Sequence, residues 1–221
     1  MPSRLNKFLT NIFSPIIEKT LRDQLAISET DNTFFVGTRR YDETDRDRLE
    51  YDRIDILEQC LEAWRESPLA RRIVELTSQY AIGGGFDVKC KHKKTKAFID
   101  QFWTHRLNRM DSRVTELCDE LTRTGNLFLL VSTDHSGMSF IRAIPATNID
   151  QIIPSDNDIE QPTLFTTKAN EELKAFTYPA YNGMTDTQKE DGSFEPVVLH
   201  YAINRPAGAQ WGESDLAPLL T

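Results

Sequence analysis

Apolar residues within residues 1–28 recur every three or four positions, the spacing that places side chains on one face of an α-helix. The stripe includes Leu5, Phe8, Ile12 and Ile16, and charged residues occupy the other face. We expect an amphipathic helix whose apolar face contacts its own domain or a neighbouring subunit. Such a helix can also lie on a membrane surface, but packing against protein is the favoured interpretation.

Residues 29–48 have no apolar period and are mainly polar, which predicts an extended arm. Its acidic run invites comparison with a calcium loop, but the glycine and the closing glutamate of an EF-hand loop are missing. Two arginines, Arg46 and Arg48, alternate with the acids. We therefore expect a solvated, self-neutralising entry to the next helix. We also expect the arm to lie across a neighbouring molecule and to gain order on that contact.

Two helices are predicted between residues 49 and 82, with a break at Ser67-Pro68. Serine is a favourable N-cap, and proline is well tolerated in the first turn of a helix. Gly83, Gly84 and Gly85 follow directly, so we expect a structural turn in which at least one glycine has a positive φ. A phosphate-binding loop would need a preceding strand and a Gly-Lys-Ser/Thr ending, and the sequence has neither.

Residues 86–90 alternate as in a short strand, and a dense group of lysines surrounds the end of this segment. This lysine patch is the best candidate in the sequence for a contact with DNA phosphates or an acidic partner. A solvated junction between a strand and a helix is the simpler explanation. The members of the patch are Lys89, Lys91, Lys93, Lys94 and Lys96.

The pattern beyond the lysines predicts two helices and then a series of strands. The helices are expected around residues 97–103 and 114–121, and Gly125 serves as a structural turn after the second one. A β-hairpin is expected over residues 127–144. Further strands are expected at 151–154, 164–167, 173–178 and 196–203, with turns or loops at 156–162, 182–193 and 205–212. Helices followed by a mostly antiparallel β-sheet predict an α+β fold.

Composition and charge exclude some classes of function. The formal net charge is −8 and the pI is about 5.1, which argues against tight binding of DNA phosphates. The three cysteines form no CxxC pair, so we expect free thiols in a reducing compartment. The first residues lead into an amphipathic helix and not into the apolar run of a signal peptide. No apolar stretch is long enough to span a membrane. We therefore expect no signal peptide and no association with a membrane.

Candidate chemistry is sparse. The four histidines show no paired metal-ligand spacing, and no nucleophile elbow is present. His200 lies on an apolar strand, where a structural histidine with satisfied hydrogen bonds is expected. We predict no catalytic residue, no metal site and no cofactor.

Five short segments nevertheless follow one another in a distinctive order. They are Ser67-Pro68 to Gly85, Phe102-Trp103, Arg123-Thr124-Gly125-Asn126, Ile141 to Pro145, and Val198 to Tyr201 followed by Gly212-Glu213-Ser214-Asp215-Leu216. In this order they resemble the N-terminal wing region of tailed-bacteriophage portal proteins, the head-to-tail connectors of the virion. The resemblance covers about residues 67–220, and residues 1–65 carry none of it.

The resemblance implies a homo-oligomeric ring, a dodecamer in assembled particles, at one vertex of the capsid. Double-stranded DNA would pass through it without sequence-specific binding during packaging and ejection. Expected partners are further copies of the chain, the major capsid protein, the terminase large subunit, scaffold and a head–tail adaptor. The N-terminal helix and the arm would then contact a neighbouring subunit or the capsid.

The same resemblance makes residues 49–221 a wing-like α+β domain and places the protein in the virion, or in the host cytoplasm during assembly. The stem, clip and crown would follow beyond this sequence. Two alternatives remain open at this stage. One is another virion component, such as a head–tail adaptor or minor capsid protein; the other is an enzyme whose site is assembled only in three dimensions.

Overall fold

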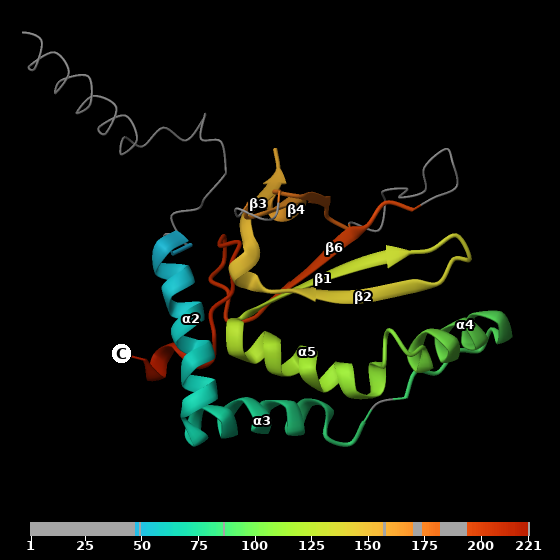
Figure 1. Ribbon diagram of the computed structural model, residues 1–221, viewed down its shortest axis with the longest axis horizontal. Helices are drawn as coiled ribbons and strands as arrows, with labels where there is room; N and C mark the ends of the chain where they lie inside the picture. Colours follow the sequence, from blue (N-terminus) through green and yellow to red (C-terminus); the bar gives the residue numbers. More distant parts are fainter. Residues whose placement is uncertain are drawn as a thin grey trace, which may run out of the picture. The chain divides into compact units, whose positions relative to one another are not determined.

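The computed structural model describes residues 47–48, 50–85, 87–156, 158–169, 174–181 and 194–220 (Figure 1). The predicted N-terminal helix, with Leu5, Phe8, Ile12 and Ile16, lies outside the described residues. So does the arm except for its last two residues, Asp47 and Arg48. The loop expected at 182–193 lies outside them as well.

Four helices precede the strands in the described chain. They are α2 (Glu50–Glu66), α3 (Pro68–Ile82), α4 (Lys93–Thr104) and α5 (Met110–Thr124). The Ser67 hydroxyl accepts a hydrogen bond from the Ala70 N–H, so the predicted N-cap of α3 is confirmed. Gly85, with φ +70°, supplies the predicted left-handed turn after α3.

Six strands form two three-stranded antiparallel sheets. One sheet has the order β2 (Ser139–Ile144), β1 (Asn126–Thr133), β6 (Val197–Ala202), and the other has the order β3 (Ile149–Ser155), β4 (Asp158–Thr167), β5 (Thr177–Pro179). A parallel bridge between Ala180 and Val198 connects the two sheets within the described residues. The fold is therefore α+β, with helices first and antiparallel strands afterwards, as the sequence predicts.

Three local predictions differ from the structure. Residues 87–90 form no strand; they are largely exposed and pair with none of the described strands. The segment expected to be a turn at 156–162 belongs largely to β4, which begins at Asp158 and pairs with β3. Irregularities in register around Pro154 accommodate the proline there. Of the strand expected at 173–178, only Thr177 and Tyr178 lie in β5, and residues 174–176 lie outside it.

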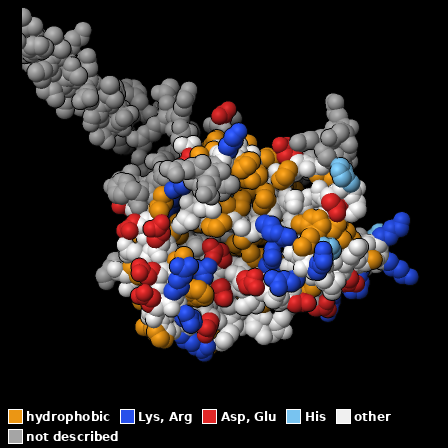
Figure 2. All heavy atoms as spheres, viewed as in Figure 1, with side chains coloured by type: hydrophobic (Ala, Val, Ile, Leu, Met, Phe, Trp, Pro, Cys, Tyr) orange, Lys and Arg blue, Asp and Glu red, His pale blue; other side chains and the backbone are white. Residues whose placement is uncertain are grey.

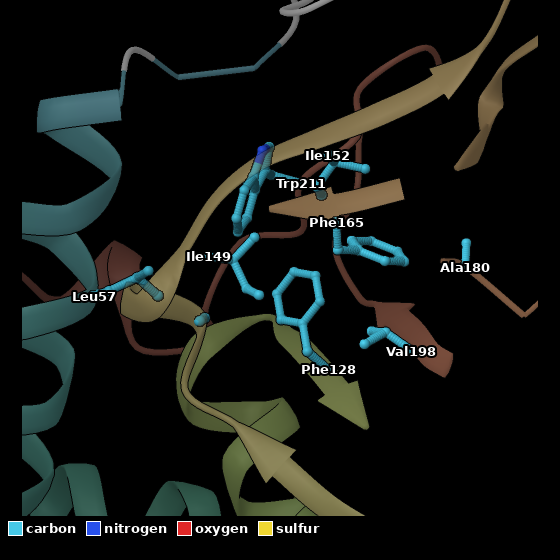
Figure 3. Close-up of a cluster of buried hydrophobic side chains, with 9 residues drawn as sticks. Leu57, Phe128, Ile149, Ile152, Phe165, Ala180, Val198 and Trp211 are labelled. Carbon is cyan, nitrogen blue, oxygen red and sulfur yellow. The ribbon is translucent and has the colours of Figure 1, made fainter. Parts of the chain in front are cut away.

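The main core lies between the two sheets and α2. Figure 3 shows Leu57 from α2, Phe128 from β1, Phe165 from β4 and Val198 from β6 converging on one cluster, with Trp211 from the C-terminal loop. The Phe128 and Phe165 rings are fully buried and meet edge to face, with centroids 5.7 Å apart. This core attaches the C-terminal loop to both sheets.

A second, smaller core joins the helices to the C-terminal turn. Cys60 from α2, Val74 from α3 and Leu216 from the C-terminal segment are all fully buried in it. Burial raises the pKa of the Cys60 thiol, so this cysteine packs as a small apolar side chain. Cys90 and Cys118 are also free thiols, but they are only partly buried.

Candidate functional site

Two of the segments that carry the portal resemblance meet directly in the fold. Asn126, which follows α5, donates from Nδ2 to the Gly212 carbonyl (2.8 Å) and accepts from the Gly212 N–H through Oδ1 (2.8 Å). The side-chain amide of Asn126 thus pairs with the backbone of a residue 86 positions away, in both directions. We call this contact, with Gly125 and His200 beside it, the motif junction.

The motif junction requires glycine at two positions. Gly125 ends α5 with φ +73°, and a Cβ there would lie 2.5 Å from the Glu213 carbonyl oxygen. At Gly212 a Cβ would overlap the Gly125 carbonyl oxygen and lie 2.9 Å from the Ile203 nitrogen. Backbone hydrogen bonds from Ile203 to Gly125 (2.9 Å) and from Glu213 to Ile203 (3.1 Å) complete the arrangement. The residue type at both positions is therefore dictated by close approach of backbones.

His200 completes the motif junction as a neutral side chain. Its Nε2 lies 3.2 Å from Asn126 Oδ1, and its ring stacks on Phe128 with centroids 4.3 Å apart. Burial lowers the pKa of His200 to about 3, and the charge of Arg205 acts in the same direction. At neutral pH the ring is uncharged and donates from Nε2 to Asn126. Among the described residues, no hydroxyl, thiol or carboxylate hydrogen-bonds to the ring.

The described end of the arm contacts its own chain. The Asp47 carboxylate accepts hydrogen bonds from the backbone N–H groups of Gln210 and Trp211, each at 2.9 Å. Arg48 pairs with Glu213 at 3.0 Å. The Arg53 guanidinium lies 3.8 Å from the centre of the Trp211 ring. These two arm residues thus contact the C-terminal loop of their own chain; the remainder of the arm lies outside the described residues.

The lysine patch lies on an exposed projection of the molecule. Lys89 and Lys91 precede α4, and Lys93, Lys94 and Lys96 occupy its first turns, all of them exposed. His92 accepts a hydrogen bond from the Thr95 N–H as the N-cap. No acidic residue lies in the first turn of α4, so the lysines add to the positive end of the helix dipole instead of compensating it. Lys96 has an ion-pair partner, Asp100, at 3.3 Å.

The outer edge of β2 is closed by side chains, which the sequence pattern did not predict. Fully buried Asn108 accepts from the Ile141 N–H (3.2 Å) and donates to the Ser139 carbonyl (3.0 Å). Its amide therefore imitates the peptide group of a neighbouring strand. Arg113 binds the next backbone group along this edge, because it donates to the Ile141 carbonyl at 2.6 Å. Open strand edges promote association of sheets, and these two side chains block part of this one.

Sites for metals and membranes are not evident in the described part of the chain. Within it, no three His, Cys, Asp or Glu side chains are grouped so as to hold a metal ion. The described helices include none that is long and apolar enough to span a bilayer.

Comparison with known proteins adds no assignment. No protein-family profile and no curated protein sequence matches this chain. The portal resemblance therefore rests on the five ordered segments of the sequence alone.

Proposed function

We propose that this chain is the wing region of a phage portal protein, a structural subunit of the ring through which DNA enters and leaves the capsid. The motif junction is the observation that carries the proposal. Asn126 lies in one segment of the resemblance and His200 and Gly212 lie in another, yet Asn126 bonds to both of them. The contact gives two of the matched segments a shared structural role.

The junction also gives these residues a mechanical reason to be present. It connects the end of α5, the start of β1, the end of β6 and the C-terminal loop through hydrogen bonds and close backbone contacts. Such a junction stiffens the domain where these four elements meet. A ring subunit that withstands DNA packaging needs a rigid wing.

The charge distribution suits a subunit that DNA passes without being held. With a net charge of −8, the surface as a whole repels a phosphate backbone. The lysine patch is a local exception, and in the proposed ring it provides a weak, non-specific contact for DNA or for an acidic segment of a partner. Terminase, scaffold, capsid protein and adaptor are the partners that the proposal implies, and no cofactor is required.

Electron microscopy of the purified complete gene product tests the proposal. Rings with a central channel, seen end-on, are the expected particles. Uniform particles without a channel would contradict the portal assignment. If the protein were found at many positions of the capsid instead of at one vertex, a minor capsid protein would be favoured.

A further inference from the structure

A groove between α5 and β2 has the features of a docking site. Its volume is about 410 Å³, and Figure 2 shows Lys and Arg side chains gathered where α5 and β2 meet. Three arginines line it, together with two glutamates, Ala143, Leu117 and Pro145. We call it the arginine groove, and its charged members are Arg113, Arg123, Arg142, Glu116 and Glu120.

The arginines of this groove are held in place by neighbouring groups. Arg113 donates to the Ile141 carbonyl, and Arg142 donates to the carbonyls of Leu107 (2.9 Å) and Ile141 (2.6 Å). Arg123 pairs with Glu120 and lies over the Trp64 ring. A guanidinium has five N–H donors, so Arg113 and Arg142 retain donors for a ligand. Because both are already oriented, binding would cost little side-chain entropy.

The strand edge within the groove is open at Ala143. In an antiparallel strand the backbone groups of alternate residues point to the same side. Those of Ser139 and Ile141 point away from β1, where Asn108 and Arg113 bind them. The N–H and C=O of exposed Ala143 therefore point outward as well. Unlike those of Ile141, they have no partner among the described residues.

The chain itself carries a segment of complementary charge. The hairpin of β3 and β4 presents three exposed carboxylates, Asp156 after β3 and Asp158 and Glu160 at the start of β4. None of the three has an ion-pair partner in the described structure; Asp158 and Glu160 accept only backbone N–H groups, those of Glu160 and Gly208. Like charges crowded in one hairpin destabilise it unless a cation is near. We call this segment the acidic hairpin.

We propose that the arginine groove of one subunit receives the acidic hairpin of a second copy of this chain. The inference rests on the proposed ring and names the contact that closes it. A groove that also contains Glu116 suits a few separate carboxylates and an extended backbone better than a continuous row of phosphates. The lysine patch is the competing cationic surface, but it lies on and before a helix and offers no strand edge, and its lysines are exposed.

The positions of the two surfaces favour a head-to-tail arrangement. In Figure 1 the end of the β3–β4 hairpin points away from the helices, whereas the groove lies between β2 and α5. One subunit therefore presents the hairpin and the groove on different sides. Two different complementary surfaces produce a heterologous contact, which closes into a ring when the rotation between subunits fits.

Charge reversal in the complete gene product tests this contact, with sedimentation velocity as the measurement. The hairpin variant carries Asp156→Lys, Asp158→Lys and Glu160→Lys. The matched control carries Asp52→Lys, Asp55→Lys and Glu58→Lys on the exposed side of α2, with the same change in net charge. The hairpin variant is expected to weaken subunit association by roughly tenfold or more, and the control to leave it near the wild-type level.

A second variant tests the groove without removing its structural arginines. Ala143→Glu places a negative charge at the exposed strand edge and should also weaken association. Combining it with the hairpin variant in one chain should restore part of the association, because the charges are again opposite. As a further control, Lys91→Glu, Lys93→Glu and Lys94→Glu should leave association unchanged.

The outcomes separate this inference from the ring itself. Rings that form equally well in the wild type and in the hairpin variant would overturn the contact and leave the portal proposal standing. If the lysine variant lost association instead, the partner of the hairpin would be the lysine patch and not the arginine groove. Open chains or dimers that depend on the hairpin and the groove would support the contact and contradict the ring. A wild-type product that remains monomeric would contradict both.

Discussion

The backbones of Gly125 and Gly212 lie against each other, so that a side chain on Gly212 would overlap the carbonyl oxygen of Gly125. This contact is the centre of the motif junction. It brings the end of α5 against the loop that follows β6, and Asn126 fixes it with two hydrogen bonds. The stability of the domain should therefore be unusually sensitive to these two small residues.

Gly125→Ala and Gly212→Ala are each expected to lower the free energy of unfolding by about 2–3 kcal/mol, because a methyl group must displace backbone. Gly137→Ala is the control. Gly137 also has a positive φ (+84°), but nothing lies within 4 Å of its Cβ position. Gly137→Ala should lower the free energy of unfolding by about 1 kcal/mol, because only the positive φ disfavours alanine there. Urea denaturation of the three variants measures the difference, and equal costs for all three would argue against a close backbone contact.

Gly85→Val is expected to lower the free energy of unfolding by about 1–2 kcal/mol, because a β-branched residue fits a φ of +70° badly. Gly84→Val is the matched comparison. Gly84 has no neighbour within 4 Å of its Cβ position and no positive φ, so its replacement should cost far less. Thermal melts that show the same loss for both would refute the assignment of the turn to Gly85.

The buried His200 predicts a specific dependence of stability on pH. In the unfolded chain its pKa is near 6.5, whereas in the folded chain it is about 3. Below pH 6.5 the unfolded state therefore binds more protons, and stability falls as pH decreases. The slope is at most about 1.4 kcal/mol per pH unit.

Replacing the imidazole with the amide in His200→Gln removes this titration. The free energy of unfolding should fall between pH 6.5 and pH 5 more steeply in the wild type than in this variant. Parallel curves for the two proteins over that range would show that His200 does not titrate as a buried neutral group.

Asn108→Ala should both destabilise the fold and promote association through β2. It leaves the Ile141 N–H and the Ser139 carbonyl unpaired, at a cost of about 1–3 kcal/mol for each buried group that water does not reach. Asn108→Asp keeps the acceptor for Ile141 but turns a buried carboxylate oxygen toward the Ser139 carbonyl, so it should destabilise the fold at least as much as Asn108→Ala. Light scattering during refolding would show whether the exposed edge aggregates; an Asn108→Ala protein as stable and soluble as the wild type would exclude the edge-capping role.

DNA affinity is expected to be weak, non-specific and centred on the lysine patch. Lys91→Glu, Lys93→Glu and Lys94→Glu together should abolish residual binding and flatten its salt dependence, because they reverse the charge of a dense group of exposed lysines that has few acidic neighbours. Reversal of Arg65, Arg72 and Arg205, also exposed, changes the net charge equally and should have a much smaller effect. Gel shifts at low salt compare the two, and unchanged binding by the lysine variant would eliminate the patch.

Local signals in the sequence were sufficient where one residue determines the structure. Ser67-Pro68 predicted the start of α3, and Gly125 predicted the end of α5, because caps and left-handed turns depend on the residue present. The hairpin of β1 and β2 followed from alternation and a turn. The order of helices and strands was enough to predict α+β.

Features that depend on residues distant in the sequence could not be predicted from local sequence signals. Asp158 reads as part of a polar turn, and only its pairing with Ser155 on β3 makes it the start of a strand. Asn108 looks like a simple helix break, although it closes the edge of β2. The arginine groove draws its residues from α5 and β2, and no spacing along the chain indicates that they meet. Such sites arise from tertiary contacts alone.

The mass of the assembled protein is the most direct test of the portal proposal. We expect light scattering of the complete gene product, with scaffold and major capsid protein present, to give one stable species whose mass is a fixed multiple of the subunit mass, as a closed ring requires. A product that stays monomeric at high concentration under the same conditions would contradict the proposal.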